Sequence, residues 1–242
     1  MKRIMTIAVF ALLMMGCGNN GNKAEQNEPS EVCVWENGQW DTDWMQKYVE
    51  YVRGNDRFYT DSRIIDLWNT WGLAYIDSDE IPEMVLLCPG EAYGNKVLTI
   101  HNGTVVEWNS WRCNAAYIPK SGLIENNDGS MGEYWDKVFV LKDGAFTEIY
   151  NHTDMLLHGH DEVNTNEFSC SLNGDTTLRV GDEMDCHQYD QQKNDIYSSK
   201  GESVNFDASM SNLPASYFEK GWQPTLPDGV TMKDYKITLS VR

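Results

Sequence analysis

The stretch Val-Leu-Thr-Ile-His-Asn-Gly-Thr-Val-Val-Glu-Trp at residues 97–108 predicts a β-hairpin. Two runs rich in β-branched residues flank the dipeptide Asn102-Gly103. A type I′ turn requires a positive φ at both central positions, and Asn-Gly adopts that conformation readily. The dipeptide therefore predicts two antiparallel strands, one on each side of it.

A second hairpin is predicted further along the chain. Residues 138–141 and 146–150 are β-rich runs, and Asp143-Gly144 lies between them. Asp-Gly supplies the same turn chemistry as Asn-Gly.

Shorter runs at residues 115–118 and 122–125 also predict strands, so we expect an antiparallel meander over residues 71–150. Residues 167–172 and 235–241 alternate in a similar way and predict further strands.

Two segments predict helices. Apolar residues fall at helical spacing over residues 43–53, and Gly54 follows as a stop signal. Residues 181–192 predict a second, short helix with acids in its first turn. The expected fold class is α+β and mainly β: an antiparallel meander sheet with an N-terminal amphipathic helix and a second short helix. Residues 56–71 fit either a short helix or a buried extended run.

The start of the chain predicts a lipoprotein signal peptide over residues 1–16. Two basic residues precede an apolar run over residues 4–15, which is too short to span a bilayer. Gly16-Cys17 follows and resembles the bacterial lipobox, in which the cysteine is acylated and begins the mature chain. We therefore expect lipidation of Cys17. The alternative is a secreted protein that is cleaved nearby.

The rest of the chain divides into a tether and one domain. Residues 17–30 contain almost no apolar side chains, which predicts a disordered tether. Residues 31–242 predict a single globular domain with the meander at its core. With Cys17 acylated, we expect the protein in the bacterial cell envelope, anchored by lipid to a membrane and facing the periplasm or the outside.

The chain is strongly acidic, with 19 basic and 37 acidic residues and a formal net charge of −18. An acidic surface repels phosphate backbones, so we expect no nucleic-acid partner. Anionic lipid is repelled in the same way, which leaves the acyl chains as the only expected membrane contact.

Five cysteines remain besides Cys17, and an exported chain permits disulfides. The pairings we favour are Cys88 with Cys113 and Cys170 with Cys186. The alternative is that these residues are buried free thiols, because sequence alone does not fix connectivity.

Residues 74–87 place an acidic turn between two strand-like runs: Ala-Tyr-Ile-Asp-Ser-Asp-Glu-Ile-Pro-Glu-Met-Val-Leu-Leu. Alternate acids followed by a later acid can surround a calcium ion with carboxylate oxygens. The candidate ligands are Asp77, Asp79 and Glu83. The alternative is a polar turn whose acids face water.

Residues 76–84 resemble the Asp-x-Asp-x-Asp-Gly-x-Pro-Glu-Leu stretch of a loose group of bacterial (Bacteroidota-type) envelope lipoproteins with no established activity. The likeness extends over residues 71–150. Tyr75 stands at the first acidic position of that pattern, and Glu80 stands at its glycine. The resemblance implies a degenerate calcium site, with a Kd of about 10⁻⁴ to 10⁻³ M.

Three histidines form another candidate site. His152, His158 and His160 lie near Asp154 and Asp161, and such a group can bind zinc. The spacing matches no established zinc motif, so a polar loop with exposed histidines is the preferred interpretation.

The chain contains nine tryptophans, and aromatic faces can stack on sugar rings. Three pairs are close in sequence: Trp40 with Trp44, Trp68 with Trp71, and Trp108 with Trp111. These residues predict either a glycan-binding platform or core packing, and core packing is preferred.

Enzyme motifs are missing from the sequence: it has no Gly-x-Ser-x-Gly, no phosphate-binding loop and no Gly-x-Gly-x-x-Gly. We therefore expect a non-catalytic binding or structural module of the envelope with a weak calcium site. Its partners would be the membrane and a glycan or an envelope protein. The alternatives are a glycan-binding protein and a hydrolase, because paired carboxylates cannot be recognised from sequence.

Overall fold

The computed structural model describes residues 31–36, 39–55, 58–60, 63–64, 70–87, 93–158, 164–172, 175–180, 186–206, 213–214, 218, 222 and 224–240. In these ranges the chain is mainly β, with antiparallel strand pairing and two α-helices. The expectation of a mainly β, antiparallel protein is therefore confirmed.

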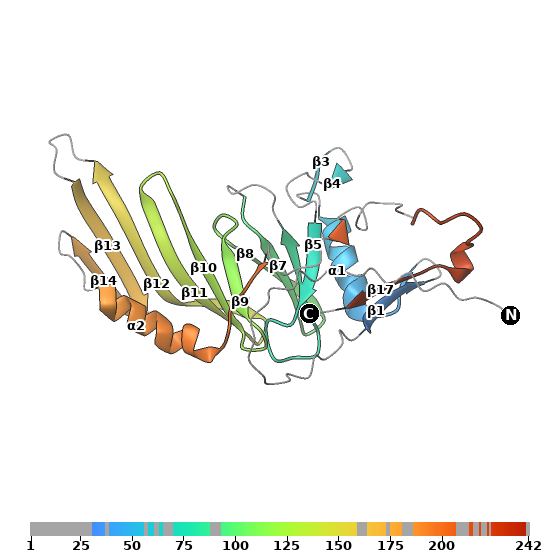
Figure 1. The fold of residues 1–242 in the computed structure, drawn as a ribbon, viewed down its shortest axis with the longest axis horizontal. Coiled ribbons are helices and arrows are strands. Elements are labelled where there is room, and N and C mark those ends of the chain that lie inside the picture. Colours follow the sequence, from blue (N-terminus) through green and yellow to red (C-terminus); the bar gives the residue numbers. More distant parts are fainter. Residues whose placement is uncertain are drawn as a thin grey trace, which may run out of the picture.

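The largest sheet has seven strands in the order β14-β13-β12-β11-β10-β9-β15. Its strands are β9 (Ala115–Ile118), β10 (Leu123–Ser130), β11 (Glu133–Lys142), β12 (Ala145–His158), β13 (Asn164–Leu172), β14 (Asp175–Val180) and β15 (Val204–Asn205). Except for β15, each strand pairs with its neighbour in sequence. The sheet forms one end of the elongated molecule in Figure 1.

A second sheet has five strands in the order β16-β5-β6-β7-β8. Its strands are β5 (Thr70–Ala74), β6 (Glu83–Leu87), β7 (Lys96–His101), β8 (Thr104–Asn109) and β16 (Leu213–Pro214). Smaller sheets are formed by β17 (Lys236–Ser240), β1 (Glu31–Glu36) and β2 (Gln39–Trp40), and by β3 (Tyr59–Thr60) with β4 (Arg63–Ile64).

Both predicted hairpin turns are present. Asn102 and Gly103 have φ values of 50° and 78° and connect β7 to β8. Asp143 and Gly144 have φ values of 52° and 71° and connect β11 to β12. These are the positive values that a type I′ turn requires, so both hairpin predictions are confirmed.

The predicted meander is not one sheet, because it divides between β8 and β9. Arg112 has a φ of 59°, which turns the chain out of the first sheet. The side chain of Asn126 then binds the irregular segment: its Oδ1 accepts the N–H of Trp111, and its Nδ2 donates to the carbonyl of Asn114. The two halves of the meander therefore face each other instead of lying edge to edge.

Helix α1 (Asp43–Gly54) covers the residues for which apolar spacing predicts a helix. Helix α2 is described over Cys186–Ile196, and residues 181–185 of the predicted helix lie outside the described residues. The acids that were expected in its first turn lie outside the described residues. Two short 3₁₀-helices, Ser198–Lys200 and Met232–Asp234, complete the helical elements described.

The core forms three clusters between successive layers. Helix α1, β1 and one face of the five-stranded sheet enclose the first, which includes Tyr48, Trp71 and Met84. The two large sheets enclose the second, which includes Val85 and Ile124. Residues near the end of α2 pack on the outer face of the seven-stranded sheet in the third. Figure 1 shows these layers side by side along the long axis.

Backbone hydrogen bonds join the two large sheets beside the acidic turn. The N–H of Lys120 donates to the Tyr75 carbonyl over 2.9 Å, and the N–H of Gly122 donates to the Ile76 carbonyl over 2.8 Å. The N–H of Leu141 in turn donates to the Gly122 carbonyl over 2.7 Å. Gly122 thus connects the end of β5 to the interior of the seven-stranded sheet.

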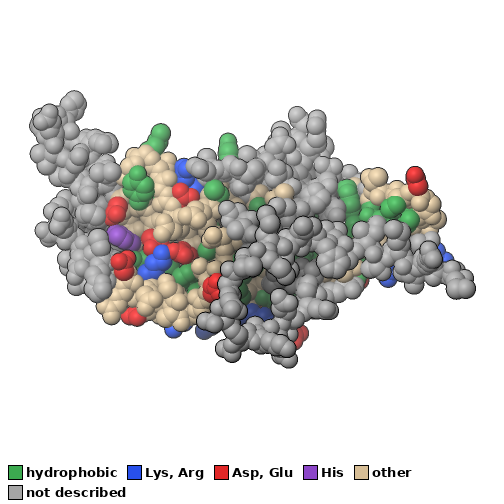
Figure 2. Space-filling model, in the orientation of Figure 1, with side chains coloured by type: hydrophobic (Ala, Val, Ile, Leu, Met, Phe, Trp, Pro, Cys, Tyr) green, Lys and Arg blue, Asp and Glu red, His purple; other side chains and the backbone are tan. Residues whose placement is uncertain are grey.

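Charged side chains are paired on the outer face of the seven-stranded sheet. Lys193 of α2 contacts both Glu125 of β10 and Asp136 of β11. Figure 2 shows basic and acidic side chains lying next to one another over these strands. These contacts hold α2 against the sheet. No described helix combines the length and the apolar character that crossing a bilayer requires.

The geometry at Gly122 predicts a stability difference between two glycines. Gly122 has a φ of 76°, and a Cβ there would lie 2.5 Å from the Leu141 carbonyl oxygen. Gly229 has a φ of 80° but open space around it. We expect Gly229→Ala to lower the free energy of unfolding by about 1 kcal/mol and Gly122→Ala to lower it by about 3 kcal/mol or more. Urea unfolding measures both losses. Equal losses would contradict the close packing of Gly122 against Leu141.

Candidate metal centre

The acidic turn lies between the end of β5 and the start of β6. The strands pair from Thr70 with Leu87 to Ala74 with Glu83, so residues 75–82 connect them outside the ladder. All three predicted ligands lie in this turn or directly after it. The short, buried strands fix both ends of the turn.

Two side-chain turns fix the aspartates. Asp77 Oδ1 accepts the N–H of Asp79 over 3.0 Å, and Asp79 Oδ1 accepts the N–H of Ile81 over 2.7 Å. An aspartate that binds the backbone two residues later forms an Asx turn, which mimics a backbone turn. Both carboxylates are therefore held close to the chain.

Glu83 supplies the buried carboxylate and has no exposed surface. Its Oε2 accepts the N–H of Ile76 over 2.8 Å, and its Oε1 accepts the hydroxyl of Thr99 over 3.1 Å. Thr99 lies on β7. Met84 pairs with Leu98, so continuing the register by one residue places Thr99 opposite Glu83.

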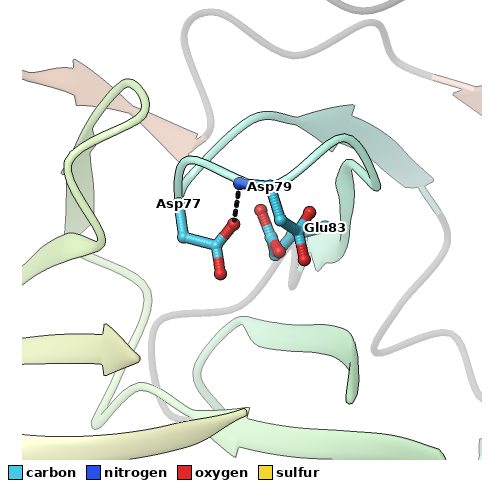
Figure 3. A group of neighbouring side chains, drawn as sticks. All are labelled: Asp77, Asp79 and Glu83. Atoms are coloured by element: carbon cyan, nitrogen blue, oxygen red, sulfur yellow. Dashed lines mark hydrogen bonds between the residues drawn. The ribbon is translucent and has the colours of Figure 1, made fainter. Parts of the chain in front are cut away.

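The three carboxylates converge. One ligand oxygen from each of Asp77, Asp79 and Glu83 lies within 4.8 Å of the others. Figure 3 shows the three groups directed toward one region beneath the turn, with the Asp79 N–H bonded to Asp77. Asp79 is exposed and Asp77 is partly buried, so the cluster runs from the surface to the interior. It can provide three carboxylate ligands to one cation.

Burial and mutual repulsion dominate the electrostatics. Burial, followed by the charge of Asp77, raises the pKa of Glu83 from 4.5 to about 8. Burial also raises the pKa of Asp77, with the Asp79 charge acting in the same direction and the Asp79 N–H opposing both. The ion pairs between described residues include none of the three carboxylates. At neutral pH without a metal, Glu83 is therefore mostly protonated.

The charge of Glu83 also affects the pKa values of two tyrosines. Burial, and then the charge of Glu83, raises the pKa of Tyr48, whose hydroxyl donates to the Pro82 carbonyl over 3.1 Å. Burial and Glu83 likewise raise the pKa of Tyr117 to about 12. Both phenols therefore stay protonated and add no negative charge to the cluster.

The two departures from the calcium-loop pattern are accommodated without strain. Glu80, at the glycine position, does not have a positive φ, and its side chain is exposed. Tyr75, at the first acidic position, lies under the ammonium group of Lys120, which is 5.2 Å from its ring centroid. Tyr75 therefore contributes packing where the fuller pattern has a carboxylate.

Sequence reasoning missed Thr99 and Tyr48, which also support this turn. Thr99 comes from β7, and Tyr48 comes from α1. Neither is close to the acids in sequence. Strand register was the one available signal for Thr99, whereas nothing local indicates the contact of Tyr48 with Pro82.

The predicted disulfides remain predictions. Cys88 lies outside the described residues, while the Cys113 carbonyl accepts the side-chain amide of Asn95 over 2.8 Å. Cys170 lies in β13 and Cys186 begins α2, but their side chains are not described. Cys17 also lies outside the described residues.

The histidine site is described only in part. His152 Nε2 lies 3.0 Å from Asp154 Oδ1, and both residues lie on β12. His160 and Asp161 fall outside the described residues, as does the side chain of His158. The zinc hypothesis therefore stays a prediction.

The tryptophan pairs separate into core and surface. Trp71 is fully buried, and Trp108 packs on Phe139 and Phe146. Trp111 is 52% exposed, with the Lys137 ammonium 4.0 Å from its ring centroid. The pairing of Trp108 with Trp111 along the sequence is therefore not a pairing of surface rings.

Comparison of the chain with protein-family models, with curated proteins and with solved structures found no match.

The raised pKa of Glu83 predicts a pH-dependent stability without calcium. The folded protein keeps the Glu83 proton up to a pH of about 8, whereas an unfolded glutamate loses it near 4.5. The stabilisation is fully present below pH 4.5 and is lost as the pH rises through about 8, with a slope of at most about 1.4 kcal/mol per pH unit. Urea unfolding in EDTA between these values measures it.

Glu83→Gln is the matched variant because its neutral amide resembles the protonated acid and does not titrate. We expect this variant to lose most of the pH dependence. An identical slope in the two proteins would show that other groups cause it.

Proposed function

We propose that this chain is a non-catalytic, lipid-anchored protein of the bacterial cell envelope whose acidic turn binds calcium as a structural ion. The observation that supports the proposal most is the convergence of Asp77, Asp79 and Glu83. The alternative of a polar turn in which all acids face water does not fit Glu83, which has no exposed surface.

A buried carboxylate must be neutralised. Taking an ionised carboxylate out of water is costly unless a cation or a proton compensates it. No basic side chain in the described parts of the chain forms an ion pair with Glu83, so a proton or an external cation has that role. The two aspartates nearby also raise the pKa of Glu83 and so favour a proton. What they add for a cation is ligand oxygens, because one calcium ion can bind all three carboxylates and a proton cannot.

Oxygen ligands favour a hard cation. The cluster offers only carboxylates, which suit calcium or magnesium better than zinc or copper. Calcium accepts an irregular shell of 6 to 8 oxygens, whereas magnesium requires a near-ideal octahedron. Three protein carboxylates of unequal exposure fit calcium better, with water completing the shell. The ion must displace the Glu83 proton, which weakens the apparent affinity at neutral pH.

The surroundings of the turn support a structural role. The Pro82 carbonyl is bound by α1 through Tyr48, Glu83 is bound by β7 through Thr99, and the Ile76 carbonyl is bound by Gly122 beside β10. An ion at the cluster would strengthen the point where three layers meet. The proposal treats residues 31–242 as one domain, with α1 as its N-terminal amphipathic helix.

The envelope location rests on the N-terminal sequence. A short apolar run that ends in Gly16-Cys17 supports lipidation of Cys17, with residues 17–30 as the tether. The net charge of −18 supports acyl chains as the means of attachment, and it disfavours nucleic acid.

Calcium should stabilise the protein and bind with a measurable heat. At free calcium roughly ten times Kd, the free energy of unfolding should rise by about 1.4 kcal/mol. Asp79→Asn should abolish most of the effect, because the amide oxygen can still accept the Ile81 N–H but the charge is lost. Calorimetry and thermal unfolding at millimolar calcium measure both.

Glu80→Gln is the matched control, because Glu80 is an exposed acid of the same turn that we exclude from the ligands. It should bind calcium like the unmodified protein. Equal and negligible heats in all three proteins would refute the calcium site.

Lipidation is tested separately. We expect Cys17→Ser to move the protein from the membrane fraction to the soluble fraction, because the proposed acyl anchor is removed. Fractionation with antibody detection and labelling with a fatty-acid analogue check this. Equal labelling of both proteins would disprove acylation at this cysteine.

A further inference from the structure

A pocket of about 480 Å³ lies along α1, from Thr42 before the helix to Arg53 in its last turn. It is formed by β1, β2, one side of α1 and Trp222. Its volume falls in the usual range of small-molecule sites, about 300 to 1,000 Å³. None of the three candidate metal ligands lines it.

Three tryptophans form the aromatic wall of the pocket: Trp35, Trp40 and Trp222. The rings of Trp35 and Trp222 meet edge to face, with centroids 5.7 Å apart. Trp35 and Trp40 pair across β1 and β2, so the backbone fixes their positions. The wall is therefore rigid on one side, while Trp222 is only partly buried.

Polar side chains from β2 and α1 line the rest. Gln39, Asp43 and Gln46 offer amide and carboxylate groups, and Arg53, whose Nε donates to the Phe218 carbonyl, adds a positive charge. One acid and one base leave the lining without net charge. Such a surface favours a neutral ligand that has many hydrogen-bonding groups.

Thr42 gives an independent indication of a ligand. It precedes α1 at the N-cap position, where a threonine hydroxyl usually accepts a helix N–H. Here the side chain makes no capping bond, and its buried Oγ1 has no hydrogen-bond partner among the described residues. Thr42 also lines the pocket. A buried hydroxyl without a partner is costly, and a ligand hydroxyl in the pocket would satisfy it.

From this lining we infer that the pocket binds a neutral saccharide, either a monosaccharide or the end of an oligosaccharide. A sugar ring has an apolar C–H face that packs on an indole ring. It also has a rim of hydroxyls that both donate and accept hydrogen bonds. Tryptophans, amides and an unpaired hydroxyl around one neutral pocket match both properties. The inference is independent of calcium at the acidic turn.

The test uses the full chain in EDTA, so that its outcome does not depend on the calcium site. Maltotetraose, cellotetraose, mannotetraose and chitotetraose are titrated separately up to about 10 mM, above the millimolar Kd of a weak site. Tryptophan fluorescence and calorimetry record binding. We expect at least one of the four to bind.

Two variants locate the site. Thr42→Val keeps the shape and removes only the unpaired hydroxyl, so it should leave the melting temperature unchanged or higher and weaken binding. Trp222→Ala should weaken binding roughly tenfold or more through the lost aromatic contact. Trp111→Ala removes an exposed tryptophan elsewhere and should bind like the unmodified protein. Asp43→Asn, at an exposed position, provides a further variant if Trp222→Ala does not fold.

Binding that is weakened by the pocket variants and not by Trp111→Ala supports the inference. It is overturned if none of the four oligosaccharides binds. It is also overturned if binding survives both Thr42→Val and the folded pocket variant, or if Trp111→Ala abolishes binding.

Discussion

The burial of one carboxylate constrains much of this structure. Glu83 lies at the start of a strand whose residues are all buried, and its two oxygens accept bonds from Ile76 in the preceding turn and from Thr99 in the following strand. Both bonds use acceptor oxygens, and a glutamine side chain has only one such oxygen. The buried acid keeps both acceptors, and burial together with the charge of Asp77 raises its pKa to about 8.

The same turn also determines how the layers meet. Its backbone accepts bonds from residues that follow β9, and one of its carbonyls accepts a bond from α1. The two large sheets consequently pack face to face at a fixed offset, with Val85, Trp108 and Ile124 between them. A small polar element thus orients much larger apolar surfaces, because hydrogen bonds are directional and hydrophobic contact is not.

The sequence predicted features whose cause is local. Asn102-Gly103 and Asp143-Gly144 specify their turns through their own backbone preferences, so the hairpins could be predicted. Asp77, Asp79 and Glu83 lie within seven residues of one another in sequence, so their grouping could also be predicted from the sequence. The division between the sheets could not be predicted, because it depends on Asn126 binding a segment 12 to 15 residues earlier. The tryptophan pocket was missed for the same reason: Trp35 and Trp222 are brought together only by the folded chain.

The pairing of β1 with β17 joins strands from opposite ends of the described chain. Glu31 lies opposite Ser240, the register shifts before Cys33, and it then continues to Glu36 opposite Lys236. Most strands of the two large sheets pair with a neighbour in sequence, so only short stretches of chain separate the paired strands. In contrast, β1 can pair with β17 only after the long intervening chain has been made. Long-range pairing has a large entropic cost until the intervening chain is compact. During synthesis from the N-terminus, β1 therefore has an unpaired edge until residues 236–240 are made, and an unpaired edge can pair with other chains.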